Sequence, residues 1–427
     1  MEDNSPDPAS PTVPAYVAPP RPAGTLTRAQ LVAAVGDGAF SVTFVGYLSH
    51  AAHLTPAWIG AVLTVAWGTG FLLTHPIGAL GDRFGLRRLT ILLALATAAA
   101  LMTLAAAPGA GVVAVACTAY AITQSGAGAT RQALLVRLVP PVELVAVRAR
   151  IQTAANVGIG IGAAAGGLAL LSGSDPAYRL VLLGDAALFA GNALLLSRLP
   201  AAAHHRRPGR AWDALRDTPY LAAAALNAVM YLYMPLLSVL LPLYLAARTA
   251  APRWLVAGVF VVNTVGVVAG QRRAARRVAT FDDATRAIRR AGVLLGAACL
   301  VFWGASRVTG PVAAAGIVLA GAALQVAGEI RLAAGSWTVG FALADPARPG
   351  QWQGVYASGI PLARAVGPAA LTGLVMVWTG PGWLLLGLVF LAAGLAATLV
   401  VTWAGNHRPF PLDTRKEETG ELRAAPA

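Results

Sequence analysis

Six ionisable side chains lie inside long apolar stretches of the sequence. They are Asp37, Arg131, Asp185, Glu329, Arg331 and Arg364. An ionisable group costs several kcal/mol in a hydrocarbon environment unless it is paired, so such groups often carry protons or bind ligands. We interpret Asp37 and Glu329 as candidate proton carriers, and Arg131 and Arg364 as their charge partners.

The composition indicates that these apolar stretches cross a membrane. The chain has 427 residues, of which 57% are hydrophobic and only 12% are charged, and its mean hydropathy is +0.65. Soluble chains carry about 25% charged residues. Allowing roughly 35 residues for one span and its connector gives about twelve spans, each with the ~20 apolar residues that a bilayer requires. We therefore predict an all-α membrane protein of twelve transmembrane helices in two six-helix bundles.

The predicted spans divide into two sets of six. The first set lies near 29–50, 57–77, 89–107, 112–138, 151–171 and 178–198, and the second near 220–246, 254–271, 290–306, 311–341, 353–379 and 383–403. This gives a disordered, Pro-rich tail over 1–28, a first bundle over 29–198 and a polar linker over 199–219. A second bundle over 220–403 and a tail over 404–427 follow.

The distribution of arginine predicts the orientation in the membrane. The net charge is +14, and the connectors that follow even-numbered spans hold most of the arginines. Because basic loops stay in the cytoplasm, we expect a multi-pass cell-membrane protein with both termini cytoplasmic. The basic clusters are then topology signals, and we expect no nucleic-acid partner. The expected partners are the bilayer and a small-molecule substrate, and we expect a monomer.

The two halves of the sequence resemble each other. Gln124 and Gly126 in the fourth span match Gln325 and Gly328 in the tenth. Repeated halves are typical of transporters that bind substrate between them, near the middle of the membrane. Candidate substrate-binding residues are the polar mid-span side chains Tyr120, Gln124, Asn227 and Gln325. Alternatively, these side chains only bond neighbouring helices together.

Depth along the helices predicts two charge pairs. At 1.5 Å per residue, Asp37 and Arg131 lie about 11 to 12 Å from the cytoplasmic face, and Glu329 and Arg364 lie about 17 to 18 Å from it. Each pair has residues at equal depth on different helices, so its members could meet. The alternative for both pairs is a static ion bridge that holds helices together.

The connector after the second span carries a family motif. It reads Gly-Ala-Leu-Gly-Asp-Arg-Phe-Gly-Leu-Arg-Arg over residues 78–88 and resembles the hallmark loop of the major facilitator superfamily at every defining position. The resemblance covers residues 29–403. It implies a latch between the halves on the cytoplasmic side, with the gating residues Gly78, Asp82, Arg83, Gly85, Arg87 and Arg88. The alternative is a tight basic turn that only obeys membrane topology.

The fifth span suggests a subtype of that family. Its glycines Gly158, Gly162, Gly166 and Gly167 resemble the Gly-x-x-x-Gly-Pro-x-x-Gly-Gly motif of the drug–proton antiporters, although Ala163 replaces the proline. Glycines at this spacing also serve ordinary helix packing. Another departure is Arg137, where relatives often carry an acid that pairs with the latch.

The sequence lacks the motifs of ATP-driven pumps and of membrane hydrolases. It has no Gly-x-x-x-x-Gly-Lys-(Ser/Thr), no His-Glu-x-x-His and no Gly-x-Ser-x-Gly, so we expect neither an ATP-driven pump nor an enzyme, and no metal or cofactor. A proton gradient is then the expected energy source. We predict a secondary active transporter that exports a hydrophobic or amphipathic small molecule in exchange for protons. The alternatives are an importer or facilitator of a nutrient or metabolite with the same fold, and a non-transporting scaffold.

Overall fold

The computed structural model describes residues 22–51, 54–106, 109–172, 174–200, 212–252 and 254–407. Within these ranges all regular structure is helical. Backbone groups in hydrocarbon must hydrogen-bond within their own segment, and helices satisfy this requirement. Among the described residues, ten helical segments are long and apolar enough to cross a membrane. The helices α1 and α5 complete the set, so the predicted twelve spans in two six-helix bundles are confirmed.

The first bundle contains six spans. They are α1 (Pro22–Gly46) with the π-helical turn η1 (Tyr47–Ala51), α2 (Pro56–Phe84), α3 (Leu86–Ala106), α4 (Ala110–Leu138), α5 (Leu144–Ser172) and α6 (Asp175–Ser197). A short 3-10 turn, η2 (Pro141–Glu143), joins α4 to α5. The α1 and α5 helices pack along each other, and α6 covers α1 and α3.

The second bundle contains six spans, two of which are broken. The seventh span combines α7 (Thr218–Met230), α8 (Tyr233–Pro235), the π-helical turn η4 (Leu236–Leu240) and α9 (Leu241–Arg248), and the eleventh combines α13 (Pro349–Ala357) and α14 (Gly359–Trp378). The others are α10 (Leu255–Arg276), α11 (Phe281–Gly304), α12 (Pro311–Ala342) and α15 (Gly380–Asn406). A 3-10 turn, η3 (Asp213–Leu215), precedes α7, and another, η5 (Ala305–Arg307), follows α11.

The breaks in these spans have local causes. Pro235 lacks a backbone N–H, so the α-helical ladder is interrupted where α8 passes into the π turn. The side chain of Pro235 also occupies the place of a Cβ at Gly367 in α14, so the two broken spans touch there. The break between α13 and α14 falls at Ser358, next to Gly359, which packs on Ala228 of α7.

Several predicted boundaries differ from the structure. The first helix begins at Pro22 rather than at residue 29, so the predicted disordered tail over 1–28 is wrong for 22–28. A proline fits the first turn of a helix, where its missing N–H is not needed. The fifth helix begins at Leu144 instead of 151, and the last helix ends at Asn406 instead of 403. Residues 1–21, 201–211 and 408–427 lie outside the described ranges, so the predicted tails and most of the linker stay predictions there.

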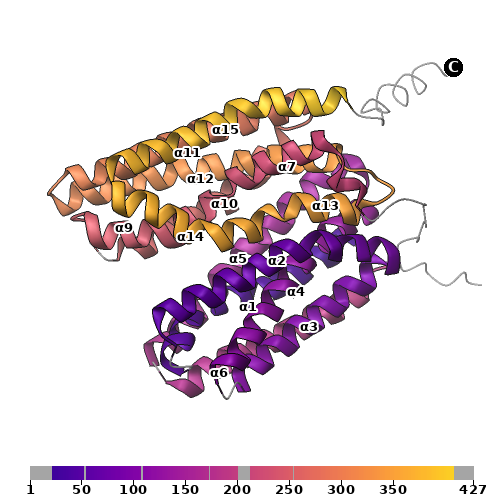
Figure 1. The fold of residues 1–427 in the computed structure, drawn as a ribbon, viewed down its shortest axis with the longest axis horizontal. Coiled ribbons are helices and arrows are strands. Elements are labelled where there is room, and N and C mark those ends of the chain that lie inside the picture. The colour runs from indigo at the N-terminus through magenta and orange to yellow at the C-terminus, as the bar shows by residue number, and fades with distance from the viewer. Residues whose placement is uncertain are drawn as a thin grey trace, which may run out of the picture.

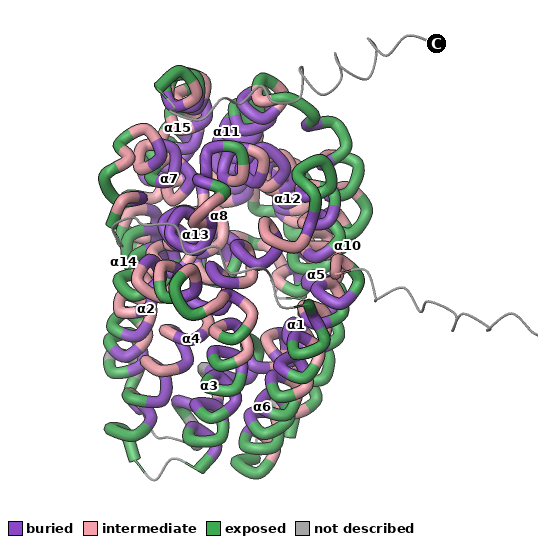
Figure 2. The backbone as a smooth tube through the Cα atoms, turned by 90° about the vertical axis from the view of Figure 1, so that its right-hand side faces the viewer, coloured by how far each residue is buried: buried purple, intermediate pink, exposed green. Residues whose placement is uncertain are grey.

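The outer surfaces of the bundles are apolar. Large hydrophobic side chains are exposed there, such as Leu72 (69% exposed), Val115 (70%) and Leu399 (76%). Figure 2 shows the residues on the outside of the helices as exposed and those between helices as buried. An apolar surface of this extent is compatible with lipid and not with water.

The two bundles meet at one end of the molecule. We call it the latch end, because the α2–α3 turn, η3 and the start of α13 lie there, on the right in Figure 1. Across the halves, α13 packs on both α2 and α4. From this end the axes of the bundles diverge towards the other end of the molecule (Figure 1).

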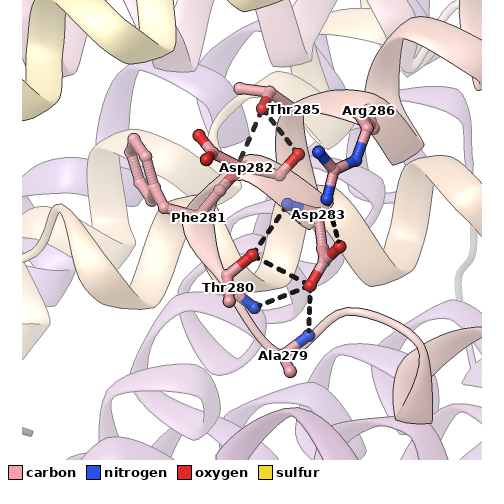
Figure 3. A network of polar contacts seen from close by, with 7 residues as sticks. All are labelled: Ala279, Thr280, Phe281, Asp282, Asp283, Thr285 and Arg286. Carbon is pink, nitrogen blue, oxygen red and sulfur yellow. Dashed lines mark hydrogen bonds and ion pairs between the residues drawn. The ribbon is translucent and has the colours of Figure 1, made fainter.

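The α10–α11 turn at the latch end is fixed by its own polar network (Figure 3). Thr280 is the N-cap of α11, and its hydroxyl accepts a 3.1 Å hydrogen bond from the N–H of Asp283. The carboxylate of Asp283 accepts from the N–H of Thr280 at 3.1 Å and pairs with Arg286 at 2.7 Å. These reciprocal bonds form a capping box, which stabilises the start of the helix without contacting the first bundle.

Candidate transport site

Asp37 lies on α1, where the first bundle faces the second. Its carboxylate accepts a 2.7 Å hydrogen bond from the amide of Gln124 and a longer one, 3.4 Å, from the hydroxyl of Tyr120, both on α4. Gln124 and Tyr120 are one helical turn apart, so they present their polar groups on the same face of α4. Two predicted substrate-binding residues therefore hold one predicted proton carrier.

Glu329 on α12 has a similar arrangement in the second bundle. Its carboxylate accepts a 2.6 Å hydrogen bond from the amide of Asn263 on α10 and a 3.3 Å bond from Gln325, one turn earlier on α12. The hydroxyl of Tyr233 on α8 also bonds to it. Each half thus holds one carboxyl group with neutral donors from a neighbouring helix.

The predicted pairing of Glu329 with Arg364 is wrong. The guanidinium of Arg364 lies 4.4 Å from the centre of the Trp67 ring on α2, in the other half, and its charge acts on Asp37. Equal depth did not bring Glu329 and Arg364 together because α14 packs against α2 and α7, not beside Glu329. Arg364 is therefore a neighbour of the first carboxyl group, not of the second.

The predicted pairing of Asp37 with Arg131 is electrostatic rather than direct. The charge of Arg131 acts on Asp37, but no ion pair within 4.0 Å joins them among the described residues. Gln124 makes the direct contact instead. Arg131 therefore lies close to Asp37 but does not pair with it.

Asn227 lies apart from both carboxyl groups. Its side-chain oxygen accepts a 2.6 Å hydrogen bond from Ser336 on α12, and Ser336 also contacts the hydroxyl of Tyr356 at 3.2 Å. Asn227 is 2% exposed. The structure thus places this predicted substrate-binding residue in a buried bond between helices of the second bundle.

A carboxylate of the first bundle caps a helix of the second at the latch end. Asp82 accepts 2.8 Å hydrogen bonds from the backbone N–H groups of Gly350 and Gln351, in the first turn of α13. Negative charge is favourable at this end of a helix, where N–H groups lack partners. Gly78 allows the approach, since a Cβ there would collide with the carbonyl oxygen of Gly350.

Arg137 adds a second bond across the latch. Its guanidinium donates a 2.5 Å hydrogen bond to the carbonyl of Ala347, just before α13. An acid at this position could not donate to a carbonyl, so this sequence uses a different contact from the one expected of its relatives.

Arg348 ties the linker to the start of α13. It donates to Asp213 of η3 and to Asp345 at 3.2 Å. Partial burial lowers the pKa of Arg348, but the hydrogen bonds to Asp213 and Asp345 outweigh this effect and raise it above its usual value. Arg348 therefore remains a cation at the latch.

The other residues of the hallmark loop lie beside this latch. Arg87 donates to the carbonyl of Ser197 at the end of α6, within the first bundle. Arg83 lies over the ring of Phe84, and both Arg83 and Arg88 are exposed. Gly85 ends α2 with a φ of 99°, a conformation that favours glycine. Of the predicted gating residues, Gly78 and Asp82 are the ones that contact the other half.

The predicted packing glycines of α5 face α1. A Cβ at Gly158 would meet the Cβ of Ala34 at 2.8 Å, one at Gly166 would meet the Ala39 carbonyl oxygen at 2.7 Å, and one at Gly162 would collide with the backbone of α1. Gly167 differs, because nothing lies within 4 Å of its Cβ position. Three of the four glycines therefore allow close helix contact.

Asp185 on α6 was not predicted to take part in the site, but it lies directly behind it. The side chain is 1% exposed, neither carboxyl oxygen has a hydrogen-bond partner, and the group occupies the Cβ position of Gly36, next to Asp37. The structure therefore shows neither a bond from Asp185 to Arg179, six residues earlier on α6, nor contact of the carboxyl group with water. Burial of a carboxyl group without a partner costs free energy.

Two residues outside the predicted site also contribute contacts, Asn263 within the second bundle and Arg148 across the two halves. Asn263 holds Glu329, and Arg148 on α5 lies 4.7 Å from the Trp337 ring centre on α12. A polar residue in an apolar span was the available signal for Asn263. No sequence signal paired Arg148 with Trp337, because the contact depends on how α5 and α12 face each other.

Two six-helix bundles that enclose polar groups at their interface and meet at a latch define this protein as a membrane transporter. The family model of the Major Facilitator Superfamily matches residues 26–338. The chain belongs to this superfamily. A search of curated proteins finds no match.

Solved structures share the fold at low sequence identity. A bacterial homologue of the iron transporter ferroportin, in an outward-facing state, is 17% identical over 91% of this chain and 100% of its own, with a TM-score of 0.73. The human organic anion transporter MFSD10 (TETRAN) is 15% identical over 88% and 99% of the two chains, with a TM-score of 0.69. The proton:xylose symporter XylE is 12% identical over 91% and 95%, with a TM-score of 0.66. Likenesses at this identity show the fold alone.

Proposed function

We propose that this transporter is secondary active and couples the movement of an amphipathic small molecule to protons by alternating access. The observation that carries this proposal is that each half holds one carboxyl group bound by neutral hydrogen-bond donors. Asp37 and Glu329 are each held by neutral amide groups rather than by a fixed ion pair. A carboxyl group without a permanent counter-ion can exchange a proton as its surroundings change between two states.

The proposal includes the orientation, the location and the oligomeric state of the protein. The latch end faces the cytoplasm, both termini are cytoplasmic and the protein acts as a monomer in the cell membrane. The arginine-rich connectors support this orientation. The proton gradient supplies the energy, and neither a cofactor, a metal nor a nucleic acid takes part.

Export in exchange for protons is the first candidate direction. It rests on the resemblance of the fifth-span glycines to the motif of the drug–proton antiporters. Import, or facilitated movement, is the second candidate. It is favoured by the positive charge of Arg131, Arg148 and Arg364 between the halves, because a bound anion and a bound proton stabilise each other there.

The test is a screen for export and uptake in a pump-deficient host, with and without a proton uncoupler. We expect the cellular level of at least one compound to change on expression, and the uncoupler to abolish the change. Asp37→Asn and Glu329→Gln should each remove uphill transport but retain exchange down a gradient. Glu143→Gln is the control, since Glu143 is an exposed acid on η2. Normal uphill transport by both carboxyl variants would contradict proton coupling through these residues.

A further inference from the structure

Three arginines gather between the two bundles. Arg364 of the second bundle lies over Trp67 of the first, and Arg148 of the first lies over Trp337 of the second. The charge of Arg131 acts on both Asp37 and Arg148. The three guanidinium groups therefore belong to one region, which both halves enclose.

The arginines of this region lie at different distances from the latch end. Arg148 and Trp337 lie near the latch end, where Trp337 lines a small cavity together with Tyr231 and Tyr356. Arg364 lies farther from the latch end, and it is exposed although it sits over an aromatic ring in the middle of the protein. Because Trp67 belongs to the other bundle, Arg364 extends into the space between the halves.

Among the residues that the structure describes, no carboxylate neutralises these arginines directly. Within the described ranges, ion pairs occur only at the latch end and join Arg286 to Asp283 and Arg348 to Asp213 and Asp345. Arg148 donates one hydrogen bond, to Gln152 at 3.1 Å, and its Nε has no partner. Each guanidinium carries five N–H donors, so most of the donors in this region are free to bind a ligand.

The nearby acids are engaged by other groups. Asp37 and Glu329 accept their hydrogen bonds from neutral amides and tyrosines. With both acids ionised, three arginines leave a surplus of one positive charge, and protonation of both acids raises the surplus to three. A positive surplus in a region of low dielectric attracts an anion and repels a cation.

We infer that the substrate is an amphipathic organic anion, whose acidic group binds Arg131 and Arg364 beside Asp37 and whose apolar part packs on Trp67 and Tyr120. This inference rests on the proposed transport function and specifies its substrate class. Guanidinium groups bind planar carboxylates and other oxyanions through two parallel hydrogen bonds, and the aromatic rings supply the apolar contact.

The charge arrangement also specifies how substrate and proton are coupled. The charged and titratable groups around Asp37 come from three elements: Arg131 and Tyr120 on α4, Arg364 on α14 and Asp185 on α6. An ionised Asp37 competes with the anionic substrate for the two arginines. A proton on Asp37 removes this competition, so anion and proton bind together and cross in the same direction. This coupling selects import, the second candidate direction, over export in exchange for protons.

The test uses purified protein in detergent and a panel of organic acids, each with the neutral amide and the amine of the same carbon skeleton. Naphthoate, naphthamide and naphthylmethylammonium form one such set. We expect acids, and not their amides or amines, to raise the melting temperature. Arg364→Gln and Arg131→Gln should each weaken binding of the best acid about ten- to hundred-fold, the effect of losing a charge-assisted hydrogen bond.

Two further variants control for folding and for charge. Arg331→Gln removes an arginine that is engaged by its own helix, since it donates at 2.8 Å to the carbonyl of Ala327, and it should bind the acid normally. Arg364→Lys keeps the charge and should retain part of the affinity if Arg364→Gln does not fold. Preference for amines or amides, unchanged affinity in Arg364→Gln and Arg131→Gln, or no stabilising acid in the panel would each overturn the inference.

Proton flux in proteoliposomes separates this inference from the proposed function. Uptake of the acid together with protons supports both. Binding of the acid without proton movement removes proton coupling and leaves the substrate class intact. Proton-coupled transport of an amine removes the anionic substrate class and leaves the proposed proton coupling intact.

Discussion

The carboxylate of Asp82 in α2 accepts a 2.8 Å hydrogen bond from the backbone N–H of Gly350 in α13. A side chain of one bundle thereby caps a helix of the other, and the bond exists only while the latch end is closed. Contacts of this kind link the chemistry of one residue to the conformation of the whole transporter.

Asp82→Asn should open the latch end without unfolding the protein. The neutral side chain loses charge-assisted hydrogen bonds worth roughly 1.5 to 3 kcal/mol, so the closed state becomes less populated. Spin labels at cysteines replacing Arg88 on α3 and Arg290 on α11, with Cys117 and Cys299 removed, would report longer distances. Transport should fall sharply.

The control for this experiment is Asp283→Asn. Asp283 is also an acid at the latch end, but its bonds stay within the α10–α11 turn (Figure 3). It should leave the distance distribution unchanged. A well-folded Asp82→Asn variant with wild-type distances and normal transport would show that Asp82 does not hold the latch.

Gly78→Ala should hinder closure by steric contact alone. A Cβ at Gly78 would collide with the backbone of Gly350, and backbone cannot move aside cheaply. The same spin-label distances should lengthen. Gly68→Ala is the matched control on α2, since nothing lies within 4 Å of a Cβ there. Equal behaviour of the two variants would argue against close packing at the latch.

Gly162→Ala should destabilise the first bundle. The added methyl group would collide with the α1 backbone near Val35, and overpacking typically costs about 1 to 3 kcal/mol. Thermal unfolding in detergent should show a lower melting temperature. Gly167→Ala, five residues along the same helix, has open space and should match the wild type. A lowered melting temperature in both variants would point to a general effect of alanine in α5.

Topology is tested with single cysteines on a background without Cys117 and Cys299. A cysteine replacing Arg216, exposed between η3 and α7, should react with an impermeant thiol reagent only from the cytoplasmic side. One replacing Ala250, exposed after α9, should react only from outside. The two positions flank the first span of the second bundle at its opposite ends. The reverse pattern would overturn the proposed orientation.

The sequence by itself determined the architecture. Twelve apolar runs must form helices, because a bilayer leaves no other partner for their backbone groups. The turn over residues 78–88 identified the family before any contact was known, since its glycines and acid stand at fixed positions of one short segment. The residues that hold Asp37 were also predictable, because Gln124 and Tyr120 were the polar groups of a single helix face.

Tertiary structure decided which charges meet. Depth along a helix follows from residue counting, but the direction a side chain faces also depends on how helices rotate against one another. The break at Ser358 separates α13 from α14, and Arg364 consequently lies over Trp67 rather than near Glu329. The burial of Asp185 against Gly36 likewise depends on α6 and α1, which are far apart in the sequence and adjacent only in the folded bundle.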